Sequence, residues 1–193
     1  MDEFILYGTL GLNHVLDLSA YDHLLFLIVL AVIFKFSQWK KVLWMITFFT
    51  LGHSITLGLA SYGILNIRLD IVEFLIPITI LITGVFNIIN ISKSHKGNEK
   101  INLLFALFFG LVHGLGFSSY FRLMIGKEED KLFPLLEFAL GIEVAQMMIV
   151  IGILIIGTFM QNICKVSKRD WIVITSAIVI WEVLPMIYNR IFW

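Results

Sequence analysis

Seven apolar segments dominate the sequence, and they constrain the fold more than any other feature. They cover residues 4–18, 22–36, 42–64, 70–91, 101–125, 134–163 and 171–190. A membrane-spanning helix needs about 20 apolar residues, so the last five segments are long enough to cross with some tilt. The first two are shorter and are expected to form a bent pair or half-helices around "LDLSAYD". These lengths predict an all-α integral membrane protein, a single compact bundle of six to seven transmembrane helices.

The composition supports a membrane protein with one domain. Hydrophobic residues make up 59% of the chain and charged residues only 15%, whereas soluble domains average about 25% charged. The formal net charge is zero, which argues against nucleic acid as a partner. A single cysteine, Cys164, excludes an intrachain disulfide and a multi-cysteine metal site. Short connections and the absence of a linker predict one transmembrane domain over residues 1–193.

The distribution of lysine and arginine predicts the orientation in the bilayer. The stretches 35–41, 92–100 and 164–170 each hold three basic residues and are expected to be cytoplasmic. The intervening stretches 61–70 and 122–131 balance their basic residues with acids and are expected outside, together with the C-terminus. If the first segment spans the membrane, the N-terminus lies inside. No cleavable signal peptide is visible, and the inner or plasma membrane of a bacterium is the expected location.

Titratable side chains recur inside the apolar segments at a similar depth. Counted from the cytoplasmic ends, these residues fall in the outer half of the bilayer: His14, Asp17, Asp22, His23, His53, His113 and Glu143. A fifth histidine, His95, lies in a polar stretch and has no predicted role. A charged side chain at mid-bilayer costs at least ~2.5–3.5 kcal/mol on insertion scales. Such groups therefore need mutual pairing, a water-filled cavity or a bound cation.

Imidazole nitrogens together with carboxylate oxygens suit a divalent transition metal such as Ni²⁺, Zn²⁺ or Co²⁺. His14 and Asp17 are three residues apart and would share a helix face. Structural explanations also exist for single residues. His113 lies between Gly110 and Gly114, a spacing that lets two membrane helices approach closely, and its ring could simply bond a backbone carbonyl. The recurrence of seven residues at one depth favours a shared metal site.

Five blocks of the sequence resemble, in order, the signature blocks of the HupE/UreJ family of membrane proteins. They read "GLNHVLDLSAYDHLLF", "FTLGHSITL", "VEFLIPITI", "FFGLVHGLGFS" and "LEFALGIEVAQ", and the resemblance runs from about residue 8 to 150. The family is associated with nickel supply to hydrogenase and urease, and its members are described as nickel or cobalt permeases. An oligomer and partners in metalloenzyme maturation are both possible, and the sequence does not identify either.

By this resemblance the metal would be carried by six residues: His14, Asp22, His23, His53, His113 and Glu143. In the family pattern the first histidine precedes the Asp-His pair by six positions. Here His14 precedes Asp22 by eight, and the longer turn contains Asp17, which is a second candidate for that place.

Two functions of different classes follow from these residues. The first is a nickel or cobalt permease that takes up metal from the outer side, with Glu143 or Glu182 passing the ion inward or exchanging protons. Glycines near the histidines would let its helices shift. The alternative is an intramembrane zinc-dependent hydrolase with an outward-facing site, a lipid or lipid-linked substrate, and Glu143 or Asp22 as the base. A third interpretation is a structural metal or polar cluster in an assembly subunit. A polar route through the cytoplasmic half favours transport, and an apolar plug there favours an enzyme or a static site.

Overall fold

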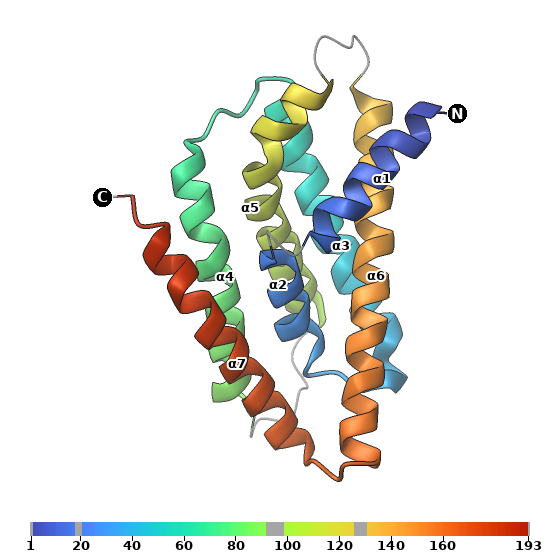
Figure 1. Cartoon of the computed structure of the whole chain (residues 1–193), viewed down its shortest axis with the longest axis vertical. Helices are drawn as coiled ribbons and strands as arrows, with labels where there is room; N and C mark the ends of the chain where they lie inside the picture. The colour runs from blue at the N-terminus through green and yellow to red at the C-terminus, as the bar shows by residue number, and fades with distance from the viewer. Residues whose placement is uncertain (1, 18–20, 92–98, 126–130, 193) are drawn as a thin grey trace.

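The computed structural model describes residues 2–17, 21–91, 99–125 and 131–192, and within them the chain is helical with no strand. The helices are α1 (Asp2–Leu16), α2 (Asp22–Ala31), α3 (Trp39–Ser61), α4 (Leu69–Ile89), α5 (Glu99–Ile125), α6 (Leu132–Asn162) and α7 (Lys168–Asn189), with a short 3-10 turn η2 (Phe36–Gln38) before α3. Helices α3 to α7 are long and apolar enough to cross a membrane. The prediction of an all-helical membrane protein is confirmed (Figure 1).

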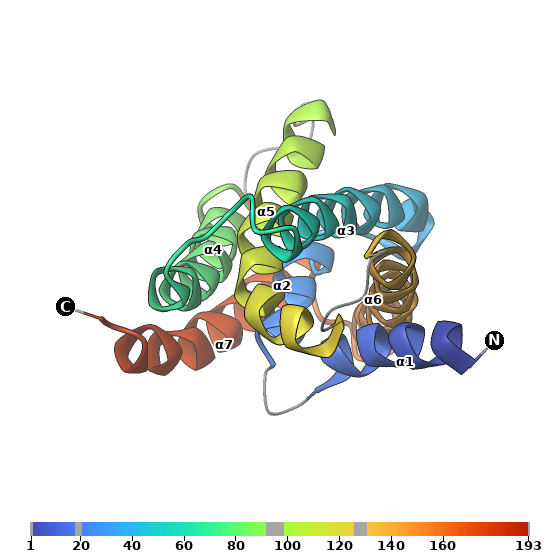
Figure 2. The ribbon, with the colours of Figure 1, turned by 90° about the horizontal axis from the view of Figure 1, so that it is seen from above.

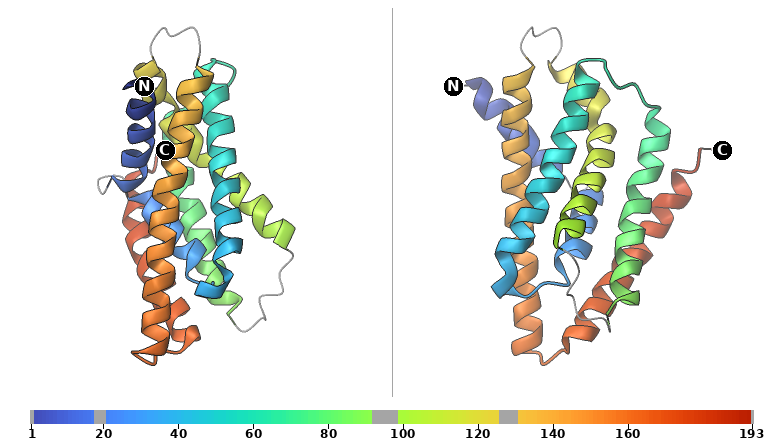
Figure 3. Two further views of the ribbon diagram at one scale, coloured as in Figure 1. Left: turned by 90° about the vertical axis from the view of Figure 1, so that its right-hand side faces the viewer. Right: turned by 180° about the vertical axis from the view of Figure 1, so that it is seen from behind.

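Helices α1 and α2 follow one another in the same direction through the bundle (Figures 1 and 3). They have 15 and 10 residues, so each is too short to span alone. Helix α1 begins at the end of the bundle that holds the α3–α4 connection, residues 62–68. Helix α2 finishes at the other end, where the 32–38 and 163–167 connections lie; we call this the basic end. The pair therefore matches the half-helix alternative, with a break between the two helices.

This arrangement predicts which connections share a side of the membrane. The native Cys164 and a cysteine introduced at Ser37, both exposed at the basic end, should react with an impermeant thiol reagent from the same side. With Cys164 replaced by serine, a cysteine at the exposed Ile64 should react from the opposite side. A tag before α1 should be cleaved from the Ile64 side, because α1 and α2 together make one crossing. Cleavage of the tag from the Cys164 side would show instead that α1 spans by itself.

Glycines bring two pairs of helices into backbone contact. A Cβ added at Gly110 or Gly114 of α5 would overlap a carbonyl oxygen of α3. A Cβ at Gly11 of α1 would overlap a carbonyl oxygen of α6, and one at Gly141 of α6 would overlap a carbonyl oxygen of α1. The close approach expected at Gly110 and Gly114 is therefore present. These contacts show why a larger residue would not fit at these positions, and the expectation that the glycines near the histidines let helices shift stays a prediction.

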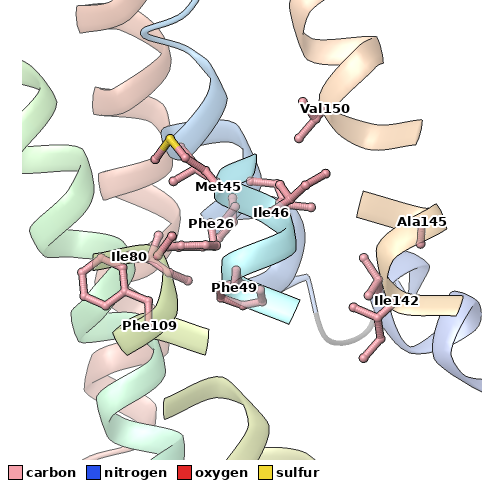
Figure 4. Close-up of a cluster of buried hydrophobic side chains, with 14 of the residues drawn as sticks. Phe26, Met45, Ile46, Phe49, Ile80, Phe109, Ile142, Ala145 and Val150 are labelled. Atoms are coloured by element: carbon pink, nitrogen blue, oxygen red, sulfur yellow. The ribbon is translucent and has the colours of Figure 1, made fainter. Parts of the chain in front are cut away.

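Helix α2 lies in the middle of the bundle, between the other helices (Figure 2). Its Phe26 packs against Phe49 of α3 and Phe109 of α5, with ring centroids 4.8 Å and 5.8 Å from that of Phe26. Apolar side chains of α3, α4 and α6 extend this cluster (Figure 4). Because the three phenylalanines lie within one helical turn of His23, His53 and His113 on the side of the basic end, they form a layer directly beneath the histidines. We call Phe26, Phe49 and Phe109 the aromatic floor.

Candidate metal centre

Four imidazole rings from four helices converge above the aromatic floor. His14 lies in the last turn of α1 and His23 in the first turn of α2, and the break between these helices brings their ring centroids to 4.7 Å. The His53 ring of α3 lies 6.0 Å from His14 and 6.1 Å from His23. His113 of α5 lies 5.5 Å from His23. His14, His23 and His53 each offer a ring nitrogen, and these atoms lie within 4.8 Å of one another.

Most nitrogens of these rings are buried without a hydrogen-bond partner in the described part of the chain. They are Nε2 of His14, His23 and His113, and both nitrogens of His53. Native proteins satisfy nearly all buried polar atoms, and each unsatisfied one costs about 1–3 kcal/mol. Several such atoms directed into one small region therefore indicate a ligand that accepts their lone pairs. A transition-metal cation fits this donor set.

The hydrogen bonds of two rings fix which nitrogen is available. Nδ1 of His23 lies 3.0 Å from Oδ1 of Asp22, and Nδ1 of His113 lies 2.9 Å from the carbonyl oxygen of Phe109. A carboxylate and a carbonyl only accept hydrogen bonds, so Nδ1 carries the proton in both rings. The lone pair then remains on Nε2, which is the arrangement by which proteins orient histidine ligands of metals. Asp22 is thus placed to orient His23.

A cavity of about 880 Å³ reaches the histidines from the end opposite the basic end. Its polar lining includes His14, Asp17, Asp22, His23, Glu73, His113 and Arg190. One water occupies about 30 Å³ of liquid, so a hydrated cation fits readily. His53 has no exposed surface and, unlike the other three histidines, does not line the cavity, so it is the deepest of the four.

Arg190 lines the cavity, although it was not among the site residues predicted from the sequence. Its Nη1 lies 3.6 Å from Oδ2 of Asp22 and donates to the carbonyl oxygen of Glu73 at 3.2 Å. The guanidinium thereby joins the end of α7 to α4 and to the first turn of α2. Asp22 therefore lies between a hydrogen bond from His23 on one side and the positive charge of Arg190 on the other.

Glu143 lies apart from the imidazoles. Its Oε1 accepts a hydrogen bond from Thr47 Oγ1 at 2.6 Å, and Oε1 of the neighbouring Gln146 accepts one from Thr50 Oγ1 at 2.9 Å. Thr50 and Thr47 precede His53 by one and about two turns of α3, so these pairs lie toward the basic end. Glu143 therefore lies closer to the basic end than the imidazole rings do, whereas the sequence predicted it at the same depth as the rings.

The remaining candidates are placed as follows. Asp17 lies just beyond the end of α1, so it does not share a helical face with His14, but both line the cavity. Glu182 is on the exposed face of α7 and does not line the cavity. His95 lies outside the described residues.

Comparison with known proteins decides the family. A family model described as HupE / UreJ protein matches residues 1–189. The chain belongs to the HupE/UreJ family. Comparisons with curated proteins and with solved structures give no match. Membership confirms the resemblance of the signature blocks, and it is consistent with a membrane protein related to the transport of nickel or cobalt.

Proposed function

We propose that this HupE/UreJ protein is a permease for a divalent transition metal, of the nickel or cobalt type. The observation that carries the proposal is the convergence of His14, His23, His53 and His113 with buried, unpartnered nitrogens. Metal–imidazole bonds are about 2.0–2.1 Å long, so ligand atoms around one ion lie about 3–4 Å apart. A contraction of about 1 Å brings the nitrogens of His14, His23 and His53 to that spacing. Asp17, on the cavity wall, is the candidate for an added oxygen ligand.

Uptake from the outer side is the direction that the charge distribution supports. Lysines and arginines are retained on the cytoplasmic side of membrane proteins. Lys35 and Lys165 lie in connections at the basic end, which is then cytoplasmic (Figure 3). The cavity opens away from it, past Glu73 near the start of α4 and Arg190 after the end of α7. A cation from outside would meet carboxylates first and imidazoles next.

The polar pairs between α3 and α6 supply the next step inward. Thr50 with Gln146, and then Thr47 with Glu143, offer oxygen atoms on the cytoplasmic side of His53. The Nε2 of Gln146 is buried and has no partner among the described residues, so this amide group can donate a hydrogen bond to a water molecule beside the ion. In this proposal the aromatic floor closes the inner side, and its opening transfers the ion to Glu143.

A transport assay tests the permease directly. Purified protein in liposomes that contain a nickel-quenched fluorophore should admit Ni²⁺. Glu143→Gln should bind Ni²⁺ at the site with unchanged affinity but admit it several-fold more slowly, because it loses the charge that receives the ion. Glu137→Gln, on the same helix but toward the outer end, is the matched control and should transport normally. Equal rates in both variants would contradict the inner step.

The alternative hydrolase is favoured by one observation, the combination of a wide cavity with a closed aromatic floor. Three imidazoles and an open position for water are the pattern of catalytic zinc. Asp22 would then be the candidate base, since Glu143 does not line the cavity. The same liposomes separate the two functions: a protein that binds metal at the histidines but admits none is not a permease. Hydrolysis of lipids in the zinc-loaded liposomes would then support the enzyme.

A further inference from the structure

Glu182 presents a carboxyl group on the membrane-facing surface of α7. The helix packs into the bundle through Ile172, Ser176, Val179 and Val183, which are buried. Glu182 is exposed, and its neighbours Ile178 and Trp181 are 57% and 73% exposed. It lies seven residues before the end of α7, about 10 Å along the helix axis. The carboxyl group is therefore inside the apolar span rather than at its edge.

Lipid chains are a poor environment for this side chain. Ionisable residues within membrane spans are costly, and they almost always face other protein or a water-filled cavity. None of the described residues is recorded in a hydrogen bond or ion pair with Glu182, and it does not line the metal-site cavity. A further polar surface must therefore cover it in the membrane.

The residues around Glu182 form a regular seam. Thr175, Ile178, Glu182, Pro185 and Asn189 follow at alternating intervals of three and four residues, the spacing of the contact positions in a left-handed helix pair. The polar members Thr175, Glu182 and Asn189 are seven residues, one heptad, apart. Around the helix axis Glu182 lies about 60° from Val179 and about 100° from Val183, so the seam runs alongside the face that packs into the bundle. We call these five residues the α7 seam.

We propose that the protein forms a dimer in which the α7 seam packs against the α7 seam of a second copy. Copies in one membrane share their orientation, so the two α7 helices cross the membrane in the same direction and are related by a two-fold axis along the membrane normal. Each seam residue then meets its own equivalent. A hydroxyl or an amide group can both donate a hydrogen bond to an identical group and accept one from it. Two carboxyl groups can share a hydrogen bond when one of them is protonated.

Polar contacts of this kind hold membrane helices together where lipid supplies no hydrophobic driving force. A second copy therefore satisfies all three polar residues in one register. The contact lies outside the metal centre and does not depend on the permease proposal.

Cysteine cross-linking tests the seam in the full chain. With Cys164 replaced by serine, Ile178→Cys in liposomes should form a disulfide-linked dimer under mild oxidation. Ala177→Cys is the matched control, since it is also exposed and adjacent but points about 100° away around the helix. It should cross-link several-fold less. Dilution of the protein in lipid should leave the Ile178→Cys product unchanged. Equal cross-linking at both positions, or loss on dilution, would overturn the proposal.

Two variants of Glu182 separate hydrogen bonding from packing. Glu182→Leu should dissociate to monomers at protein-to-lipid ratios where the wild type is dimeric. Glu182→Gln should remain dimeric, because paired amides still donate and accept. Single-molecule photobleaching counts the copies, and bound Ni²⁺ per chain should be unchanged in both variants. A wild type that is monomeric throughout, or a Glu182→Leu dimer as stable as the wild type, would show that the α7 seam is not an interface.

Discussion

His53→Ala is expected to lower the affinity for Ni²⁺ by at least about 100-fold, since groups that merely support a metal ligand already contribute 10–100-fold. The His53 ring has no exposed surface, and neither of its nitrogens has a hydrogen-bond partner among the described residues. Alanine would remove a ligand from the deepest part of the site, where no solvent can replace it. Equilibrium dialysis of the purified protein with metal analysis measures the change.

The matched control for this variant is His95→Ala, which removes the one histidine that the sequence places outside the apolar segments. It should bind Ni²⁺ like the wild type. Thermal unfolding of both variants shows whether the fold is retained. If His53→Ala binds Ni²⁺ as tightly as His95→Ala, the His53 ring only fills space between α3 and its neighbours.

Gly110→Ala is expected to destabilise the protein by about 1–3 kcal/mol, the usual cost of overpacking a core. The added methyl group would overlap the carbonyl oxygen of Phe49, which is backbone and cannot rotate away. Helices α3 and α5 would have to separate, and with them His53 and His113. Thermal unfolding in detergent should show a lower midpoint, and Ni²⁺ binding should weaken in the same variant.

Gly152→Ala provides the comparison for this substitution. Gly152 lies within α6, and no atom approaches within 4 Å of a Cβ placed there. Alanine favours helix over glycine, so the midpoint should stay the same or rise slightly. Equal destabilisation by the two substitutions would mean that loss of a glycine, and not the α3–α5 contact, is responsible.

The sequence predicted the long helices well because their apolar runs match the thickness of a bilayer. The first two segments were harder. Their length was compatible with two thin crossings or with half-helices, and sequence alone does not show in which direction the chain continues after residue 17. The packing of α1 against α6 and of α2 within the bundle shows that the two helices are successive halves of one membrane crossing (Figures 1 and 2).

The meeting of the histidines followed from their similar depth in separate segments, and the structure brings the four rings together. The depth of a residue, counted from the end of its segment, is uncertain by about one helical turn. For this reason Glu143 was expected at the level of the rings, although it lies closer to the basic end. The antiparallel register of α3 and α6, which pairs Glu143 with Thr47, is a tertiary property. Arg190 went unnoticed because it is the last residue of the final apolar segment, where a basic residue is common at the membrane surface, and only the tilt of α7 brings it to Asp22.

X-ray absorption spectroscopy of the Ni²⁺-loaded protein at the nickel edge tests most directly whether these histidines hold the cation. The account predicts a first shell dominated by nitrogen, with the outer-shell scattering that imidazole rings produce from three to four ligands. In His53→Ala any remaining bound nickel should show one imidazole fewer. A first shell of oxygen atoms without imidazole scattering would contradict the account, and the four rings would then be a polar contact between closely packed helices.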